Sequence, residues 1–117
     1  MADIGVWDLV RVPFPYTNRP VQQRRPALVV AVPRSDGAPG LLWVLMVTSA
    51  ANRGWRDDVV VSDLAVAGLP APSVIRTAKI AIIEMRDAER IGTLSSADRI
   101  GVSKALQTNV AIATAQG

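Results

Sequence analysis

Short apolar runs bounded by prolines constrain the fold of this chain most strongly. The clearest run, 27–32 (Ala-Leu-Val-Val-Ala-Val), lies between Pro26 and Pro33 and directly follows Arg24 and Arg25. Such a run, half of it β-branched, is typical of a strand with both faces covered. Proline costs no ladder hydrogen bond at the first position of a strand, so we expect the arginine pair at the strand entrance. A guanidinium held there suits a phosphate site, although arginines at a loop end can also serve solubility alone.

Further runs predict a mainly β chain with a C-terminal helix. Strands are expected at 5–12, 27–32, 41–47, 57–62 and 90–94, with a strand pair's worth of residues in 73–84. Proline- and glycine-containing segments separate these strands, and Pro13 is expected to end the first one. Six or seven short strands predict a strongly bent sheet or a partly closed barrel.

One helix is expected at roughly 96–115. Ser95 or Ser96 is a suitable N-cap, and Asp98 falls in the first turn. An apolar stripe on one face of this helix predicts packing against the core. Its members are Val102, Leu106, Val110 and Ala113, with Ala105 beside them.

The length and composition indicate one domain, residues 1–117, in the cytoplasm. A chain of 117 residues can bury a single core, and with only 4% aromatic residues that core must consist of Val, Ile, Leu and Ala. No run approaches the roughly 18 apolar residues that a membrane span needs. The start, Met1-Ala2-Asp3, lacks the basic region of a signal peptide.

The absence of cysteine and histidine excludes several kinds of chemistry. Disulfides, thiolate metal sites, Ser-His-Asp triads and His/Cys zinc sites are all impossible without these residues. A carboxylate metal site needs clustered acids, and only Asp57 and Asp58 are adjacent in the sequence. We therefore expect metal-independent chemistry and no cofactor.

Positive charge is concentrated in the first third of the chain. The net charge is only +3, yet no acidic residue lies between Asp8 and Asp36. The arginines in this interval are Arg11, Arg19, Arg24, Arg25 and Arg34. Arginine grips phosphate bidentately, so a local field of this kind suits a polyanion better than a neutral partner.

Several ordered blocks of the sequence resemble the MazF/PemK/Kid family of toxins. The blocks are 5–10 (Gly-Val-Trp-Asp-Leu-Val), 25–30 (Arg-Pro-Ala-Leu-Val-Val), 47–49 (Val-Thr-Ser), 69–76, 80–84 and 92–95. The resemblance implies a small SH3-like, half-open barrel of the CcdB/Kid type with an appended helix, usually as a homodimer. It also implies a metal-independent endoribonuclease that cuts single-stranded RNA at short sequences and is silenced by a cognate antitoxin, expected to be acidic.

Three residues match catalytic positions of that family. The resemblance implies that Arg25 is the catalytic arginine before proline, that Thr48 is the catalytic threonine at a strand end, and that Arg76 is the arginine of the Kid branch. The Kid branch has an acidic residue two positions beyond that arginine, but this chain has Ala78 there, so a role as base is not carried over. The usual Gly-rich loop with Glu-Gln is replaced by 20–24 (Pro-Val-Gln-Gln-Arg), so the RNA specificity and loop motion of the family are not carried over.

Metal-free RNA cleavage uses the 2′-OH as an internal nucleophile and yields a 2′,3′-cyclic phosphate and a 5′-OH end. Fixed arginine donors stabilise the charge that gathers on the non-bridging oxygens, and a threonine hydroxyl can hydrogen-bond the phosphate or the 2′-OH. The general base stays open among Asp57, Asp58 and Glu84.

Further residues are expected to contact RNA, mostly in two loops. They are Tyr16, Thr17, Arg19, Gln22, Arg24, Ser49, Arg53, Trp55 and Lys79. Trp55 fits a loop anchor or interface residue better than a base-stacking ring, although RNA sites use such rings. Two other functions stay open: a CcdB-like, non-catalytic gyrase poison, and a degenerate family member that only pairs with an antitoxin.

Overall fold

The computed structural model describes residues 4–14, 23–33, 40–52 and 54–115. The strands are β1 (Asp8–Phe14), β2 (Gln23–Ala31), β3 (Leu41–Ser49), β4 (Val59–Val60), β5 (Ser73–Glu84) and β6 (Glu89–Thr93). The helices are η1 (Ala50–Asn52) and η2 (Met85–Asp87), both 3-10 helices, and α1 (Leu64–Ala67) and α2 (Ser96–Ala115).

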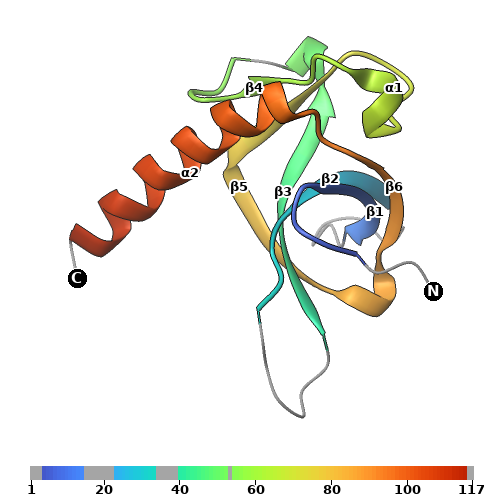
Figure 1. Ribbon diagram of the computed structural model, residues 1–117, viewed down its shortest axis with the longest axis horizontal. Helices are drawn as coiled ribbons and strands as arrows, with labels where there is room; N and C mark the ends of the chain where they lie inside the picture. The colour runs from blue at the N-terminus through green and yellow to red at the C-terminus, as the bar shows by residue number, and fades with distance from the viewer. Residues whose placement is uncertain (1–3, 15–22, 34–39, 53, 116–117) are drawn as a thin grey trace.

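The six strands form one antiparallel sheet in the order β4-β5-β3-β2-β1-β6. Figure 1 shows the sheet curling into a half-barrel, with α1 above β6 and α2 crossing one side before projecting away from the strands. This architecture confirms the predicted half-open β barrel with a C-terminal helix.

The sheet carries a hydrophobic core on each face. One cluster, which includes Leu28, Leu45 and Ile75, packs with Val102 of α2. The other cluster includes Ala27, Val29 and Val44 on the opposite face. Residues 27–29 are fully buried, which confirms that this part of β2 has both faces covered. Ala67 of α1 and Val102 of α2 belong to the first cluster, so the helices cover that face, and the curled sheet closes over the second cluster.

The arginine pair lies inside β2 and not at its entrance, which corrects the expected strand bounds. β2 begins at Gln23, and β1 continues through Pro13, which lies opposite Arg24. Pairing of β2 with β3 begins only at Ala27, next to Pro26, and a proline fits a position beside the end of a ladder.

The segment 73–84 is one long strand and not a strand pair. Its register with β3 shifts abruptly, because Leu45 lies opposite Ile80 while Met46 lies opposite Arg76. The intervening residues of β5 are extra on that side, and a local excess of this kind bends a strand. One bent strand therefore pairs with β3 on both sides of the bend.

The short helix α1 was not expected from the sequence, because only proline- and glycine-containing connections were expected between the strands. The Asp63 side chain caps its start, and Gly68 ends it in the left-handed conformation (φ 73°). A Cβ on Gly68 would lie 2.0 Å from the Ile91 oxygen, and one on Gly92 would lie 2.3 Å from the Ala67 carbonyl carbon. Glycine at both positions therefore lets α1 and β6 pack backbone against backbone.

Helix α2 has the predicted bounds, but only its first half packs against the core. Val102 and Ala105 are buried and Leu106 is partly buried, whereas Val110 is 57% exposed, contrary to the predicted stripe. The side chain of Ala113 lies outside the described residues. Among the helices described, none is long and apolar enough to cross a membrane.

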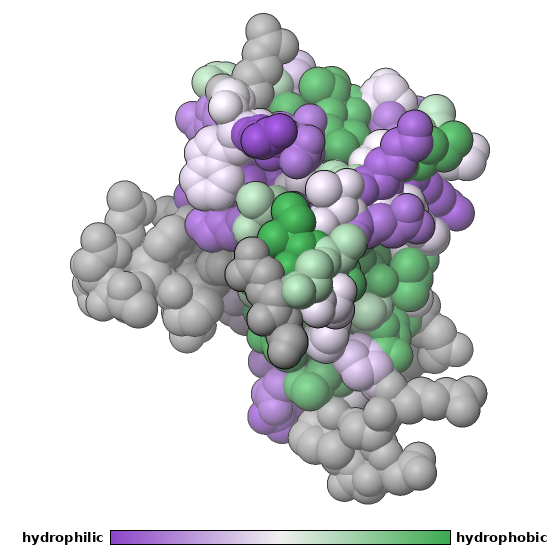
Figure 2. All heavy atoms as spheres, turned by 90° about the vertical axis from the view of Figure 1, so that its left-hand side faces the viewer, coloured by the Kyte–Doolittle hydropathy of each residue, from purple (hydrophilic) through white to green (hydrophobic). Residues whose placement is uncertain are grey.

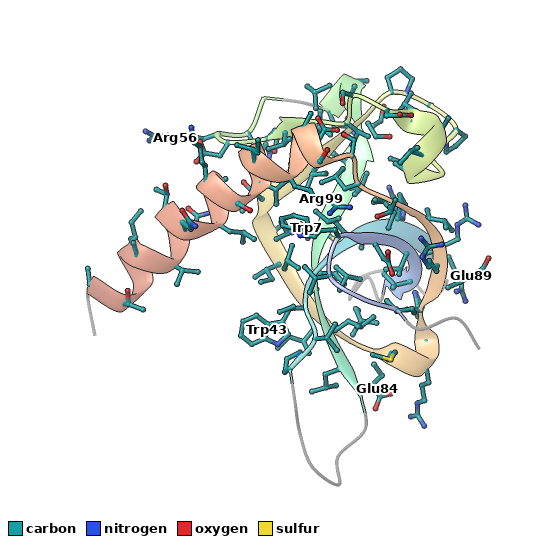
Figure 3. All side chains as sticks on the ribbon, viewed as in Figure 1. Trp7, Trp43, Arg56, Glu84, Glu89 and Arg99 are labelled. Carbon is teal, nitrogen blue, oxygen red and sulfur yellow. The ribbon has the colours of Figure 1, made fainter. Side chains whose placement is uncertain are left out.

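The start of α2 is fixed by polar contacts to the body of the protein. The buried Asp98 carboxylate accepts hydrogen bonds from the Ser62 backbone N–H (2.8 Å) and hydroxyl (3.0 Å). Arg99 donates from Nε to the Leu94 carbonyl (2.9 Å), and its guanidinium lies 5.8 Å from the Trp7 ring (Figure 3). These contacts hold the start of α2 against the segments that follow β4 and β6.

Candidate functional site

Strand register places Arg25, Thr48 and Arg76 on one face of the sheet. Ala27 lies opposite Met46 in the β2–β3 pair, and Met46 lies opposite Arg76 in the β3–β5 pair. Residues directly opposite each other share a face, and so do residues two apart on one strand. Arg25 is two residues from Ala27 and Thr48 is two from Met46, so the three predicted catalytic side chains point to the same side.

The Thr48 hydroxyl is bound by the turn that follows its own strand. Thr48 is half-buried near the end of β3, and its Oγ1 accepts a hydrogen bond from Asn52 Nδ2 at 3.1 Å. Asn52 ends η1, which begins directly after β3. The Ala50 backbone N–H donates to the Pro72 carbonyl at 2.9 Å, which ties this turn to the start of β5. The turn therefore presents the asparagine amide to the threonine.

Arg76 is enclosed by the loop 50–58. Its Nε and Nη2 donate to Asp58 Oδ1 and Oδ2 at 3.4 and 3.2 Å, and Nη2 also donates to the Asn52 carbonyl at 2.6 Å. The guanidinium lies 4.1 Å from the Trp55 ring centroid, a cation–π distance. The side chains of Arg76 and Asp58 are only 12% and 7% exposed. Three residues of one loop thus hold a single arginine.

These contacts determine what Arg76 can still do chemically. Asp58 occupies its Nε and Nη2 edge and Trp55 covers a face, while no described residue accepts a hydrogen bond from Nη1. Arginine has five N–H donors, so the Nη1 edge remains able to bind an anion. Asp58 balances the charge of Arg76, and Arg25 is the second guanidinium on this face of the sheet.

Sequence reasoning missed Asn52 and left Asp58 open as one of three carboxylates. Of these, Asp58 is the one beside Arg76, and it orients that arginine with both of its oxygens. Glu84 instead pairs with Arg86 at 3.0 Å, at the far end of β5. No sequence signal indicates the contact of Asn52 with Thr48 or that of Asp58 with Arg76, because both contacts depend on how the loop 50–58 folds back over β5.

Two predicted RNA-contacting residues lie on the face opposite the catalytic candidates. Alternation along a strand turns Arg24 away from Arg25 and Ser49 away from Thr48. Arg24 Nη2 donates to the Arg11 carbonyl at 3.2 Å, and the Ser49 hydroxyl accepts from the backbone of the following turn.

The remaining predicted contacts are divided between exposed and undescribed residues. Trp55 is 51% exposed although Arg76 stacks on it, and Lys79 is exposed where the β3–β5 register shifts. The others lie outside the described residues and remain predictions. They are Tyr16, Thr17, Arg19, Gln22 and Arg53.

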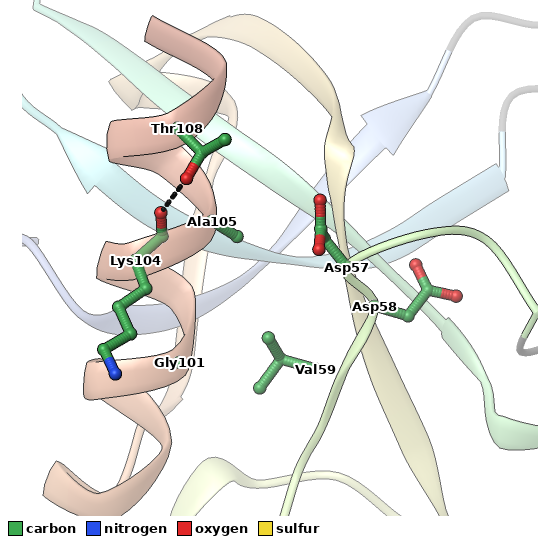
Figure 4. Close-up of a pocket in the computed structure, with 7 residues that line it drawn as sticks. All are labelled: Asp57, Asp58, Val59, Gly101, Lys104, Ala105 and Thr108. Carbon is green, nitrogen blue, oxygen red and sulfur yellow. Dashed lines mark hydrogen bonds between the residues drawn. The ribbon is translucent and has the colours of Figure 1, made fainter. Parts of the chain in front are cut away.

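A cavity of about 280 Å³ adjoins the site between the loop and α2 (Figure 4). It is lined by Asp57, Asp58, Val59, Gly101, Lys104, Ala105 and Thr108. Figure 4 shows that neither aspartate carboxylate points toward Lys104, so the cavity has no charge pair across it. Among the described residues, no three His, Cys, Asp or Glu side chains converge as a metal site requires.

Comparison with known families and structures identifies the class of protein. Residues 6–110 match the PemK-like, MazF-like toxins of type II toxin–antitoxin systems, and the chain belongs to this family. No match was found among curated proteins. Crystallised MazF from Deinococcus radiodurans is similar in fold, with 24% identity, TM-score 0.68 and coverage of 91% of this chain and 94% of that one.

Two further structures are similar in fold. MazE-MazF from Deinococcus radiodurans aligns with TM-score 0.66 and 24% identity, covering 90% of this chain and 92% of that one. The Mycobacterium tuberculosis toxin MazF-mt6 aligns with TM-score 0.61 and 22% identity, covering 85% and 92% respectively.

Proposed function

We propose that this toxin is a metal-independent, sequence-specific endoribonuclease that cuts single-stranded RNA, including mRNA, in the cytoplasm. The single observation that carries the proposal is the shared face of Arg25, Thr48 and Arg76, which come from three neighbouring strands. Residues 1–117 act as one toxin domain. Two guanidinium groups and a hydroxyl on one face provide the donors that a phosphodiester needs as it gathers charge.

In the proposed reaction, the 2′-oxygen attacks the adjacent phosphorus while the bond from phosphorus to the 5′-oxygen breaks. The 2′-OH loses its proton to a base, the 5′-oxygen gains one, and the products are a 2′,3′-cyclic phosphate and a 5′-OH. Arg25 and the Nη1 edge of Arg76 stabilise the non-bridging oxygens, and Thr48 donates to the phosphate. Because the nucleophile belongs to the substrate, holding the sugar in position provides much of the acceleration.

An acidic antitoxin is proposed as the regulatory partner. One of the similar structures is of MazE-MazF, and the basic residues of this chain provide a field complementary to an acidic segment. We propose that the antitoxin segment lies across Arg76 and the arginine-containing loop between β1 and β2, where it competes with RNA. If bound antitoxin left RNA cleavage unchanged, this placement would be wrong.

Incubation of the purified protein with a long single-stranded RNA in EDTA tests the nuclease proposal. We expect discrete fragments with 5′-OH ends, reduced at least 100-fold in Arg25→Ala and Thr48→Ala, a loss typical of removing a transition-state donor. Arg86→Ala, at the far end of β5, is the matched control and should cleave normally. Intact RNA together with gyrase-dependent DNA breakage would support a CcdB-like poison.

A non-catalytic antitoxin-binding protein is the second candidate. The observation that favours it is the pairing of Arg76 with Asp58, since a balanced guanidinium contributes less net charge to a transition state. Intact RNA, intact DNA and tight antitoxin binding in the same preparation would establish this function instead.

A further inference from the structure

We propose that Asn52 is a positioning residue that turns the Thr48 hydroxyl into a hydrogen-bond donor directed at the scissile phosphate. The inference rests on the proposed nuclease function and assigns the group that prepares one of its donors. Asn52 lies four residues beyond Thr48, outside every sequence block that resembles the family, and its amide contacts the Thr48 oxygen at 3.1 Å.

The direction of this hydrogen bond decides what the hydroxyl can offer to RNA. A threonine hydroxyl has one proton to donate and two lone pairs that accept, whereas an asparagine NH₂ group only donates. With Asn52 Nδ2 donating, one lone pair of Thr48 Oγ1 is occupied and its proton remains available. A phosphate oxygen is a charged acceptor, so the freed O–H finds its strongest partner there.

Asn52 can orient Thr48 because its own backbone is held on both sides. Its carbonyl accepts the 2.6 Å hydrogen bond from Arg76, which is itself fixed by Asp58 and Trp55. At the other end of the same short turn, the Ala50 N–H is bonded to the start of β5. An exposed hydrogen bond competes with water, and prior ordering of the donor reduces the entropy lost when the bond forms.

The contacts of Asn52 also connect Thr48 with Arg76, which lie on different strands. Thr48 lies on β3 and Arg76 on β5, and Asn52 contacts both through different groups, its amide and its carbonyl. The side-chain contact can therefore be removed by mutation while the carbonyl contact to Arg76 remains. This separation makes the proposal testable without dismantling the loop.

Asn52→Asp is the decisive variant because aspartate has the same shape but only accepts hydrogen bonds. It should draw the Thr48 proton toward itself and lower kcat about 10- to 100-fold, a loss expected for a misdirected catalytic group. Asn52→Ala leaves the hydroxyl free to rotate and should lose less. A purely structural role predicts the reverse order, with alanine worse than the isosteric aspartate, and that order would overturn the proposal.

Two controls distinguish loss of Thr48 hydroxyl orientation from the effect of an added negative charge and from disruption of the loop. Ala51→Asp places a carboxylate on the exposed neighbouring residue, so it should raise KM while leaving kcat within about twofold. In a Thr48→Val background, Asn52→Asp and Asn52→Ala should cause no further loss of kcat, because the hydroxyl through which Asn52 acts is gone. A full additional loss there would contradict the proposal.

A measurement without RNA keeps this inference distinct from the nuclease function. The side-chain amide protons of Asn52, followed by NMR, should change in chemical shift when Thr48 is replaced by valine. If the wild-type protein fails to cleave RNA but these protons respond, the contact exists and the nuclease proposal is wrong. If RNA is cleaved but the protons are insensitive to Thr48, Asn52 does not orient the hydroxyl.

Discussion

At the residue scale, one partly buried arginine organises the candidate site. Arg76 connects β5 to the loop 50–58 through an ion pair, a carbonyl contact and an aromatic ring. A buried ion pair adds little net stability over apolar residues, but removing one partner leaves an uncompensated charge. The pair therefore specifies where the loop lies more than it increases the free energy of unfolding.

Asp58→Asn should destabilise the protein by about 3 kcal/mol, because it leaves the Arg76 charge buried without its partner. The neighbouring exposed residue gives a matched control: Asp57 has a positive φ (67°) that asparagine also tolerates. Urea unfolding should show Asp57→Asn within about 0.5 kcal/mol of the wild type. Equal unfolding midpoints for the two variants would mean that the ion pair does not hold the loop.

At this scale the sequence predicts part of the site. Arg25, Thr48 and Arg76 are identifiable from family resemblance, and strand alternation then places them on one face. Asn52 and Asp58 are not identifiable, because their contacts arise from a loop conformation that residue type does not encode. Which of the three carboxylates meets Arg76 is likewise decided only by the path of the backbone.

At the element scale, the close approach of α1 to β6 depends on two glycines. The sequence shows a turn here, but the helix is only one turn long, and hydrophobic periodicity cannot reveal so short an element. Helix α2 was predictable because it is long: a serine N-cap and an apolar stripe over several turns gave the bounds that the structure shows. The predicted strands 41–47 and 90–94 are correct within two residues, whereas β1 and β2 have other bounds than expected, β4 is shorter than 57–62, and 73–84 is one bent strand.

Gly92→Ala should destabilise the fold by about 3 kcal/mol, since its Cβ would meet the backbone of Ala67 and the backbone cannot rotate away as a side chain can. Gly101→Ala is a control of opposite sign. Its Cβ would lie an ordinary 3.6 Å from the Val59 methyl groups, and alanine favours a helix by about 1 kcal/mol. Thermal unfolding should therefore lower Tm in the first variant and raise it in the second.

At the scale of the whole molecule, an apolar surface covers one side of the half-barrel. Ile80 (52% exposed) and Ile82 (61%) share a face of β5, and Trp43 (42%) lies opposite Ile82. A cavity of about 330 Å³ separates Ile80 from Val110 on α2. Figure 2, which looks onto this side, shows hydrophobic side chains between hydrophilic ones. Exposed apolar patches commonly mark interaction sites, so we predict that a second copy of the chain binds here in the homodimer expected from the family resemblance.

We expect the chain to dimerise through this surface, and Ile82→Glu should then give a monomer, because burying an unpaired carboxylate in an apolar interface is costly. Sedimentation measures the change in mass directly. Val66→Glu, an equally drastic change on exposed α1, should leave the dimer intact. A dimer that survives Ile82→Glu would place the interface elsewhere.

We propose above all that the face of the sheet carrying Arg25, Thr48 and Arg76 promotes attack by the RNA 2′-OH. The most direct test uses a cleavable oligonucleotide in which only the nucleotide before the scissile bond lacks its 2′-OH. The account predicts that this single change abolishes cleavage at that bond while binding persists, and that the unmodified RNA yields a 2′,3′-cyclic phosphate. Cleavage of the deoxy substrate at the same bond would contradict it.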